Sequence, residues 1–308
     1  MARCARPVPL ALALVAALSG CGGGSSAPPS PPPAPGSGAR TVVVAGEQRA
    51  YRVYDPGGRR PGERPALVVA LHGTGGDGAS FERLSGWDAV ARRAKAIVVY
   101  PSSHGRAWRP QPDATADVDF LKRVIDDVSA ANDVDRARVY VTGFSIGGFM
   151  SLRLACVAAD RITAIASVAG ALPQDCPRPP ARPVPVLSIA ALEDATVPYG
   201  GAGPQTWTGA LPDAHTVVRR WVAWDGCSVT PRRLAEARVI TEVWTGCRGG
   251  AEVRLASIAE WGHVYPTWAA QAPIDAPATS WAFLRRFRTP APLPRPAPRP
   301  PRRASRGS

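Results

Sequence analysis

The segment RVYVTGFSIGGFMSLRLAC, residues 138–156, constrains the fold more than any other part of this sequence. A β-branched run ends at Gly143, a serine follows two positions later, and Gly147 and Gly148 lead into an apolar helical pattern. A G-x-S-x-G sequence at a strand-to-helix turn holds the serine in a strained backbone conformation that lifts its hydroxyl above the sheet. A side chain at Gly143 or Gly147 is expected to collide with the neighbouring strand or helix. We therefore predict that Ser145 is a nucleophile at the end of a buried strand.

Around this turn the sequence alternates between strand and helix patterns. Apolar runs predict strands at 41–46, 49–55, 66–73, 96–101, 137–143, 162–170, 184–192 and 251–260. Apolar stripes at helical spacing predict helices at 116–130, 146–159, 214–227 and 278–287. Such alternation predicts an α/β fold, with a mostly parallel central sheet, helices on both faces and an antiparallel pair leading the sheet. We place this single domain at residues 41–288.

The two ends of the chain have a different character. Residues 1–20 combine a short basic start with an apolar run too short to span a bilayer, which predicts a signal peptide. The ending LSGC resembles a bacterial lipobox, in which Cys21 becomes the lipidated first residue; the alternative is an ordinary secretory signal with a chance cysteine. Residues 21–40 then form a linker rich in Pro, Gly and Ser, and residues 289–308 a disordered tail rich in Pro and Arg. We expect an exported protein, either a cell-envelope lipoprotein or a secreted one.

The formal net charge of +13 does not indicate nucleic-acid binding. Seven of the arginines that produce it lie in the first six residues and the last fourteen. No basic patch with interleaved aromatic residues accompanies the rest. The expected partners are an ester substrate and, through Cys21, a membrane, with no nucleic acid; the tail can contact anionic lipid or wall polymer.

Cysteine usage supports export. Outside the leader and Cys21 the chain has Cys156, Cys176, Cys227 and Cys247. Four cysteines allow three pairings, and the sequence does not choose among them. We favour the sequential pairs, each closing a short loop worth about 3 kcal/mol on the chain-entropy model. No zinc or other metal site is expected, because no C-x-x-C pair or nearby histidine offers ligand spacing.

A serine nucleophile needs a histidine base to take its proton. The chain has four histidines, and the order serine, acid, histidine that accompanies such a turn leaves His215 and His263 as alternatives. His263 follows the last predicted strand on a loop beside a glycine, whereas His215 starts a predicted helix. We predict His263 as the base.

The acid that orients this histidine is expected on a strand-end loop between Ser145 and His263. The stretch VPVLSIAALEDATVPYGG offers Glu193 and Asp194, of which Asp194 is favoured. Asp225 is a weaker alternative, which its position otherwise marks as a surface charge at a helix end.

Acyl transfer also requires backbone donors for the developing oxyanion. One is expected to be the amide of Ile146, directly after the nucleophile. The other is expected from HGTGG after the third predicted strand, at Thr74 or Gly75.

Four segments make the chain recognisable: LHGTGGDGASF, GFSIGGFMSLRLAC, VPVLSIAALEDATVPYGG and GCRGGAEVRLASIAEWGHVYP. Together they resemble the polyhydroxybutyrate depolymerase and feruloyl esterase family of α/β-hydrolases, which includes bacterial lipoproteins, over Thr41 to about Phe287. The resemblance implies Ser145 as nucleophile, Asp194 as acid and His263 as base.

The resemblance also implies a Cys227–Cys247 disulfide, and a place for Trp108 at the edge of the substrate pocket; the alternative for Trp108 is a surface tryptophan. The family usually has His-Gly before the acid, where this chain has Ala190 and Ala191, so the pocket shape is expected to differ. The extra substrate-binding domain of polymer-degrading members is not among these segments, so oligomers are favoured over solid polyester.

The motifs predict a serine hydrolase that works through an acyl-enzyme with no cofactor, and the resemblance implies an esterase that acts on hydroxyalkanoate oligomers, feruloyl esters or acetyl esters. The alternatives are a catalytically idle surface lipoprotein that binds a ligand, and a serine peptidase or thioesterase on the same fold.

Overall fold

The computed structural model of the chain describes residues 38–172, 176, 178–206 and 209–289. The predicted signal peptide, Cys21, most of the linker and nearly all of the tail lie outside these residues. Within the described part, no helix is both long enough and apolar enough to cross a membrane.

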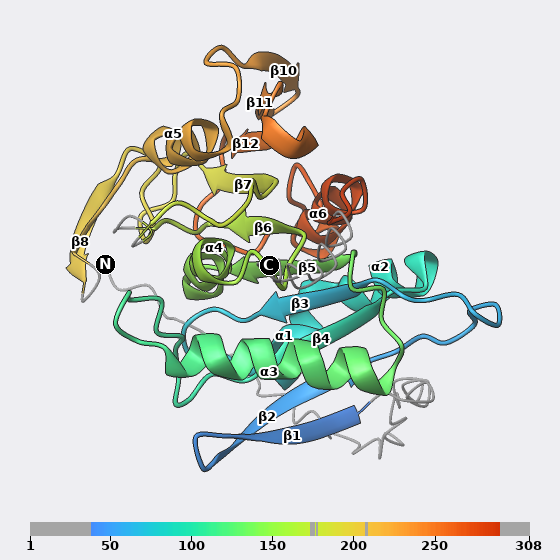
Figure 1. The fold of residues 1–308 in the computed structure, drawn as a ribbon. Coiled ribbons are helices and arrows are strands. Elements are labelled where there is room, and N and C mark those ends of the chain that lie inside the picture. The colour runs from blue at the N-terminus through green and yellow to red at the C-terminus, as the bar shows by residue number, and fades with distance from the viewer. Residues whose placement is uncertain (1–37, 173–175, 177, 207–208, 290–308) are drawn as a thin grey trace, which may run out of the picture. The chain divides into compact units, whose positions relative to one another are not determined.

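A ten-stranded sheet forms the centre of the fold, in the order β1-β2-β4-β3-β5-β6-β7-β12-β11-β10 (Figure 1). The strands are β1 (Gly38–Val44), β2 (Glu47–Tyr54), β3 (Leu67–Leu71), β4 (Ile97–Pro101), β5 (Val139–Phe144), β6 (Ala164–Val168), β7 (Val186–Ala191), β10 (Arg232–Glu236), β11 (Val239–Trp244) and β12 (Val253–Ile258). The six central strands from β4 to β12 pair in parallel, and antiparallel pairings add two strands at each edge. A separate hairpin pairs β8 (Ala202–Thr206) with β9 (Gly209–Leu211).

Helices cover both faces of the sheet, as the sequence predicts. They are α1 (Gly78–Ser85), α2 (Trp87–Ala94), α3 (Ala116–Ala131), α4 (Ile146–Val157), α5 (Ala214–Asp225) and α6 (Ala276–Leu284), with short 3₁₀ turns η1 (Arg248–Gly250) and η2 (Trp268–Ala270). Buried residues of α3, α4 and α5 share one core cluster, and those of α1, α2 and α6 share the other. The central strands are buried on both faces, which explains their continuous apolar sequences.

The predicted elements are found, together with some that the patterns did not indicate. All eight predicted strands and all four predicted helices are present, and the leading antiparallel pair is β1 with β2. Strands β8 to β11 and helices α1 and α2 are additional.

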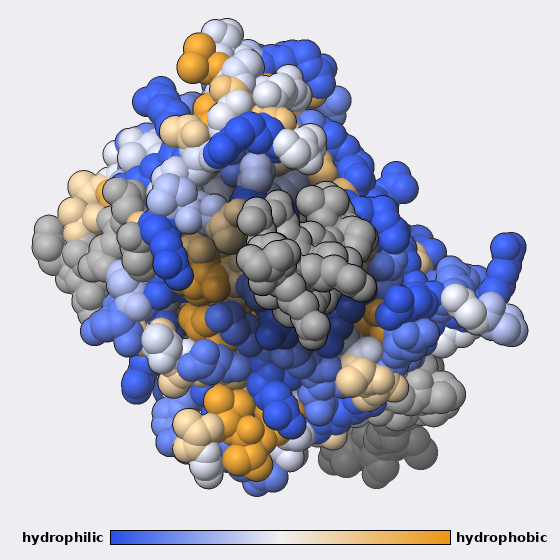
Figure 2. Space-filling model, in the orientation of Figure 1, coloured by the Kyte–Doolittle hydropathy of each residue, from blue (hydrophilic) through white to orange (hydrophobic). Residues whose placement is uncertain are grey.

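The surface reflects the burial of the apolar side chains in the core. On the side of the molecule that Figure 2 shows, hydrophilic residues cover most of the surface, and hydrophobic residues gather in small patches.

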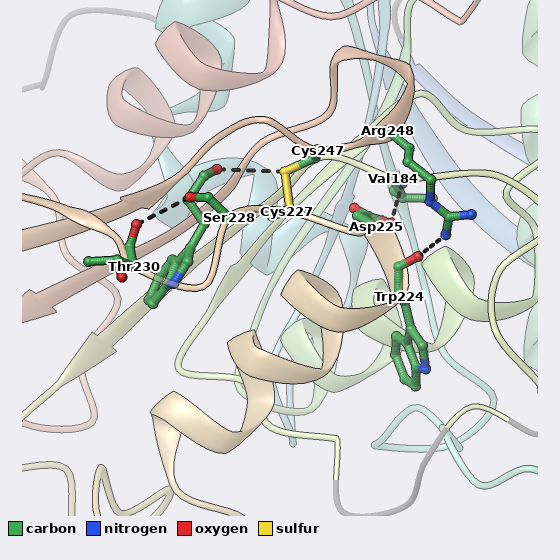
Figure 3. Close-up of a disulfide and its surroundings, with 9 residues drawn as sticks. Val184, Trp224, Asp225, Cys227, Ser228, Thr230, Cys247 and Arg248 are labelled. Carbon is green, nitrogen blue, oxygen red and sulfur yellow. Dashed lines mark hydrogen bonds between the residues drawn. A yellow bond between two sulfur atoms is a disulfide. The ribbon is translucent and has the colours of Figure 1, made fainter.

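Both disulfides have the sequential pairing, Cys156–Cys176 and Cys227–Cys247. The second bond joins the segment after α5 to the segment after β11 (Figure 3). Because Trp244 at the end of β11 pairs with Val253 at the start of β12, this disulfide lies at the edge where the parallel strands begin.

The described chain ends at that edge. The Thr289 amide donates to the carbonyl of Ala137, just before β5 begins. Strand β1 is antiparallel to β2, which is antiparallel to β4, so β1 runs in the same direction as the central strands, and its first residue, Gly38, lies level with Val99 in the middle of β4.

Candidate functional site

Ser145 lies between the end of β5 and the start of α4, at the edge where the parallel strands end. Its backbone has φ 54° and ψ −123°, a region that non-glycine residues rarely adopt. The Ser145 amide donates to the carbonyl of Val168 at the end of β6, which fixes the turn to the neighbouring strand. The strained turn that the G-x-S-x-G sequence predicts is therefore present.

The two glycines of this turn are required by close backbone approach. A Cβ atom on Gly147 would lie 2.4 Å from the carbonyl oxygen of Leu71, at the end of β3. A Cβ atom on Gly143 would lie 2.2 Å from the carbonyl oxygen of Gly147 itself. Neither backbone atom can move without displacing a strand or the first turn of α4, so the predicted collisions are real.

His263 reaches Ser145 from the loop after β12. Its Nε2 atom is 2.9 Å from Ser145 Oγ, and its Nδ1 atom is 2.7 Å from Asp194 Oδ2. The side chains of His263 and Asp194 are 19% and 1% exposed, so the pair is largely shielded from water. The three residues form one hydrogen-bonded line from the ends of β5, β7 and β12.

The Asp194 carboxylate is held in its ionised form by its surroundings. Burial raises its pKa, but hydrogen bonds from His263 and from the backbone amides of Val197 and Thr196 outweigh burial and leave the pKa of Asp194 below its ordinary value. Those amides donate to Oδ1, which leaves Oδ2 for the imidazole. An ionised carboxylate at Nδ1 fixes the histidine tautomer in which Nε2 accepts a proton from the serine.

The alternative acid Glu193 and the alternative base His215 are not part of this hydrogen-bonded line. Glu193 is exposed, next to Asp194. His215 is in α5 and its Nε2 atom is 2.7 Å from Glu242 Oε2.

The structure contradicts the interpretation of Asp225 as a surface charge. Asp225 is 1% exposed, and its Oδ1 accepts from the Val184 amide near the Cys227–Cys247 disulfide (Figure 3). Because Val184 precedes the start of β7, this is the edge of the sheet opposite Ser145. Burial raises the pKa of Asp225 to about 7. The residue is therefore a buried, weakly acidic carboxyl that cannot orient His263.

Thr74 and Gly75, the two candidate oxyanion donors in the loop after β3, differ in whether their amides are already hydrogen-bonded. The Gly75 amide donates to the carbonyl of Arg106 at 2.7 Å and is therefore occupied. Among the residues that the structure describes, no acceptor is found for the amide of Thr74. Of these two alternatives, Thr74 is therefore the free donor; the other candidate donor, Ile146, is the first residue of α4.

Trp108 was expected at the edge of the substrate pocket, but its side chain is fully buried. Its indole Nε1 donates to the carbonyl of His72, and its ring lies 5.0 Å from the His72 ring, centroid to centroid. The side chain packs under the loop instead of facing solvent, while Trp108 belongs to the lining of the groove along this segment.

His72 completes this support and was not assigned a role by its sequence position. Its Nε2 atom accepts from the Ser103 amide, so the ring proton is on Nδ1, which donates to the carbonyl of Gly73. Burial lowers the pKa of His72, which agrees with a neutral ring. The only signal in the sequence is its place directly before the glycine-rich loop.

With this geometry in view, comparison with known proteins decides the family. A family model described as alpha/beta hydrolase fold matches residues 66–219, half of the chain. The protein belongs to the α/β-hydrolase family. The resemblance to feruloyl esterases and polyhydroxybutyrate depolymerases is also confirmed, because relatives with those names are similar to this sequence.

Three such relatives are informative. A putative esterase, NocK, from Nocardia uniformis subsp. tsuyamanensis is 42% identical over 176 residues, which cover 53% of this chain and 50% of the relative. Feruloyl esterase B from Piromyces equi is 30% identical over 223 residues, 68% of this chain and 41% of the relative. Poly(3-hydroxyalkanoate) depolymerase C from Paucimonas lemoignei is 35% identical over 118 residues, 34% of this chain and 27% of the relative. The matched part spans half or less of the length of each relative.

Proposed function

We propose that this α/β-hydrolase is a serine esterase in which Ser145 is the nucleophile, His263 the general base and Asp194 the orienting acid. The observation that supports it most is the hydrogen-bonded line from Asp194 Oδ2 through both nitrogens of His263 to Ser145 Oγ. The strained backbone of Ser145 and the names of the esterase relatives support the same function.

In the proposed mechanism the reaction has two halves. His263 Nε2 takes the proton from Ser145 Oγ as the oxygen attacks the ester carbonyl, and the negative charge of the tetrahedral intermediate is stabilised by the amides of Ile146 and Thr74. Asp194 stabilises the imidazolium, which then gives its proton to the departing alcohol. A water molecule, deprotonated by His263, attacks the acyl-serine and releases the acid with Ser145 restored.

The proposed substrates are carboxylic esters of the kinds named in the relatives, hydroxyalkanoate oligomers and feruloyl esters, together with acetyl esters. The proposed location is outside the cytoplasm, attached through a lipid on Cys21 and the part of the predicted linker that precedes β1, since residues 38–40 belong to that strand. Two disulfides in the catalytic body, residues 41–288, support export, because such bonds form in oxidising compartments.

The test compares Ser145→Ala with the unaltered protein on short p-nitrophenyl esters and with a fluorophosphonate probe. We expect wild-type protein to hydrolyse the esters and to be labelled, and Ser145→Ala to do neither while keeping its circular dichroism spectrum. The matched control is Ser228→Ala, because Ser228 is an exposed serine whose hydroxyl contacts only the carbonyl of Thr230 among the described residues. Hydrolysis or labelling that survives in Ser145→Ala contradicts the proposal.

The lipid anchor has a separate test in a bacterial host that processes lipoproteins. With radiolabelled palmitate, the unaltered protein is expected to carry label in the membrane fraction, and Cys21→Ser to carry none. Unlabelled wild-type protein in the culture medium contradicts the anchor and leaves the esterase function standing.

A further inference from the structure

A groove of about 600 Å³ runs along the segment that joins β4 to α3. Its lining comes from residues between His104 and Ala114, all from this one segment. The proposed catalytic residues lie outside it, so the mechanism above does not use it.

The groove adjoins the loop that carries the proposed oxyanion donor. A Cβ atom on Gly73 would lie 3.5 Å from Ser145 Cβ, so this loop begins beside the nucleophile. Two residues further on, a Cβ atom on Gly75 would lie 3.5 Å from Nη2 of Arg106, and the Gly75 amide donates to the carbonyl of Arg106. Three consecutive residues of one loop therefore connect Ser145 to the guanidinium of Arg106.

Two guanidiniums of the groove are free to bind an anion. Arg106 and Arg109 are exposed, and no hydrogen bond or ion pair to either guanidinium is found within the described residues. By contrast, the Arg109 backbone amide is bound by the buried Asp117, whose other oxygen binds Arg49. The backbone of the segment is thus fixed, while its two cationic side chains face solvent.

The other charged groups of the groove do not cancel these two. His104 lies 3.4 Å from Glu47 at the surface, which pairs that histidine with a carboxylate of its own. Asp113 is the acidic residue of the lining. Two unpaired arginines against one aspartate leave an excess of positive charge in a groove that adjoins the loop of Thr74.

We propose that this groove binds a carboxylate carried by the substrate, so that esters with a free carboxylate, such as linear hydroxy-acid oligomers, are preferred to neutral esters. The inference rests on the proposed esterase function and names its substrate class. A guanidinium binds a carboxylate through two parallel N–H···O hydrogen bonds, which a neutral amide or methyl ester of the same size cannot reproduce. Because both arginines are exposed, each contributes a modest amount, about a threefold preference.

The experiment uses two matched pairs of esters. In the first, 4-acetoxybenzoate and 4-acetoxybenzamide differ by a carboxylate on the alcohol side. In the second, p-nitrophenyl hydrogen glutarate and p-nitrophenyl glutaramate differ by a carboxylate on the acyl side. For each pair the ratio of kcat/KM, charged to neutral, is measured in the wild type, Arg106→Gln, Arg109→Gln and the double variant. Comparing ratios between variants removes differences in intrinsic reactivity.

We expect the ratio of at least one pair to fall about threefold in each single variant and about tenfold in the double variant, through KM. The matched control is Arg93→Gln, which removes an equally exposed charge from α2 and is expected to leave both ratios unchanged. Added salt is expected to lower the wild-type ratio and to leave that of the double variant unchanged.

Equal ratios in the wild type and the double variant overturn the inference, as does an equal fall in Arg93→Gln. In either case hydrolysis of the neutral esters by the wild type still supports the esterase function. A wild-type protein that hydrolyses none of the four esters overturns the proposed function itself.

Discussion

The imidazole of His263 stacks on the ring of Phe144, with ring centroids 5.0 Å apart and an angle of 29° between the planes. Phe144 directly precedes Ser145. Tyr265, two residues after His263, packs edge-on against the ring of Phe144. The residue before the proposed nucleophile therefore also positions the proposed base.

Loss of that ring is expected to slow catalysis. In Phe144→Ala the imidazole has no surface to lie against, and a small displacement of a catalytic group reduces kcat by about ten- to a hundredfold. KM is expected to change little, and Phe144→Tyr, which keeps the ring, is expected to retain most activity. Steady-state kinetics on one short ester decide this, and an unchanged kcat in Phe144→Ala contradicts it.

Asp194→Asn tests the orienting role of the carboxylate. The asparagine oxygen can still accept from the amides of Thr196 and Val197, but its NH₂ group then faces His263 Nδ1 and favours the wrong tautomer. We expect kcat to fall by about 10⁴-fold, as for the corresponding change in a serine protease triad. Glu193→Gln removes the neighbouring exposed carboxylate and serves as the control. Similar kinetics in the two variants would speak against Asp194.

Gly147→Ala tests the packing of α4 on β3. The added methyl group meets the carbonyl of Leu71 at 2.4 Å, and a backbone atom of a central strand cannot give way. The free energy of unfolding is expected to fall by about 3 kcal/mol, the upper end of the overpacking range. Gly200→Ala, where a Cβ atom meets nothing within 4 Å, is expected to leave it unchanged. Urea denaturation measures both, and equal midpoints would disprove the close approach.

Trp108→Phe tests whether the tryptophan supports the loop or binds substrate. The change leaves the His72 carbonyl without its indole donor, and we expect about 1–3 kcal/mol lower stability and a reduced kcat. Because the side chain is fully buried, KM values for esters of different chain length are expected to stay the same. Trp268→Phe, at a side chain 64% exposed, is the control. KM changes in Trp108→Phe that depend on the chain length of the ester would show that Trp108 contacts the substrate.

The raised pKa of Asp225 is expected to make the free energy of unfolding depend on pH. Its pKa is about 7 in the folded protein and about 3.9 when unfolded, so the folded state binds the extra proton between these values. This contribution to stability is fully present below about pH 4 and is lost as the pH rises through about 7, up to roughly 4 kcal/mol at 1.36 kcal/mol per pKa unit.

Asp225→Asn removes that titration while keeping an oxygen for the Val184 amide. We expect the wild type to lose stability relative to this variant from pH 4 to pH 8, measured by urea denaturation at each pH. If the free energies of unfolding of the two proteins change in parallel from pH 4 to pH 8, the Asp225 carboxylate is ionised in the folded protein over that whole range, and its pKa is not raised.

Much of the fold can be predicted from the sequence, because the central strands are buried on both faces and appear as unbroken apolar runs. Strand β10, Arg232–Glu236, is exposed at every position and has no such signal. Strand β11 alternates only weakly, and α1 and α2 are eight residues each, too short for a clear stripe.

The residues proposed for catalysis follow from chain order and from their places after apolar runs. The choice between Thr74 and Gly75 does not, because it depends on a hydrogen bond from Gly75 to Arg106, thirty-one positions away. The burial of Trp108 and Asp225 likewise depends on what packs around them, which local pattern does not encode.

The place where the described chain ends has a practical consequence. Thr289 lies at the end of the sheet opposite Ser145, so a carrier or solid support joined directly at Thr289 is attached to the back of the catalytic body. Immobilised there, that body presents its reactive side to the surrounding medium.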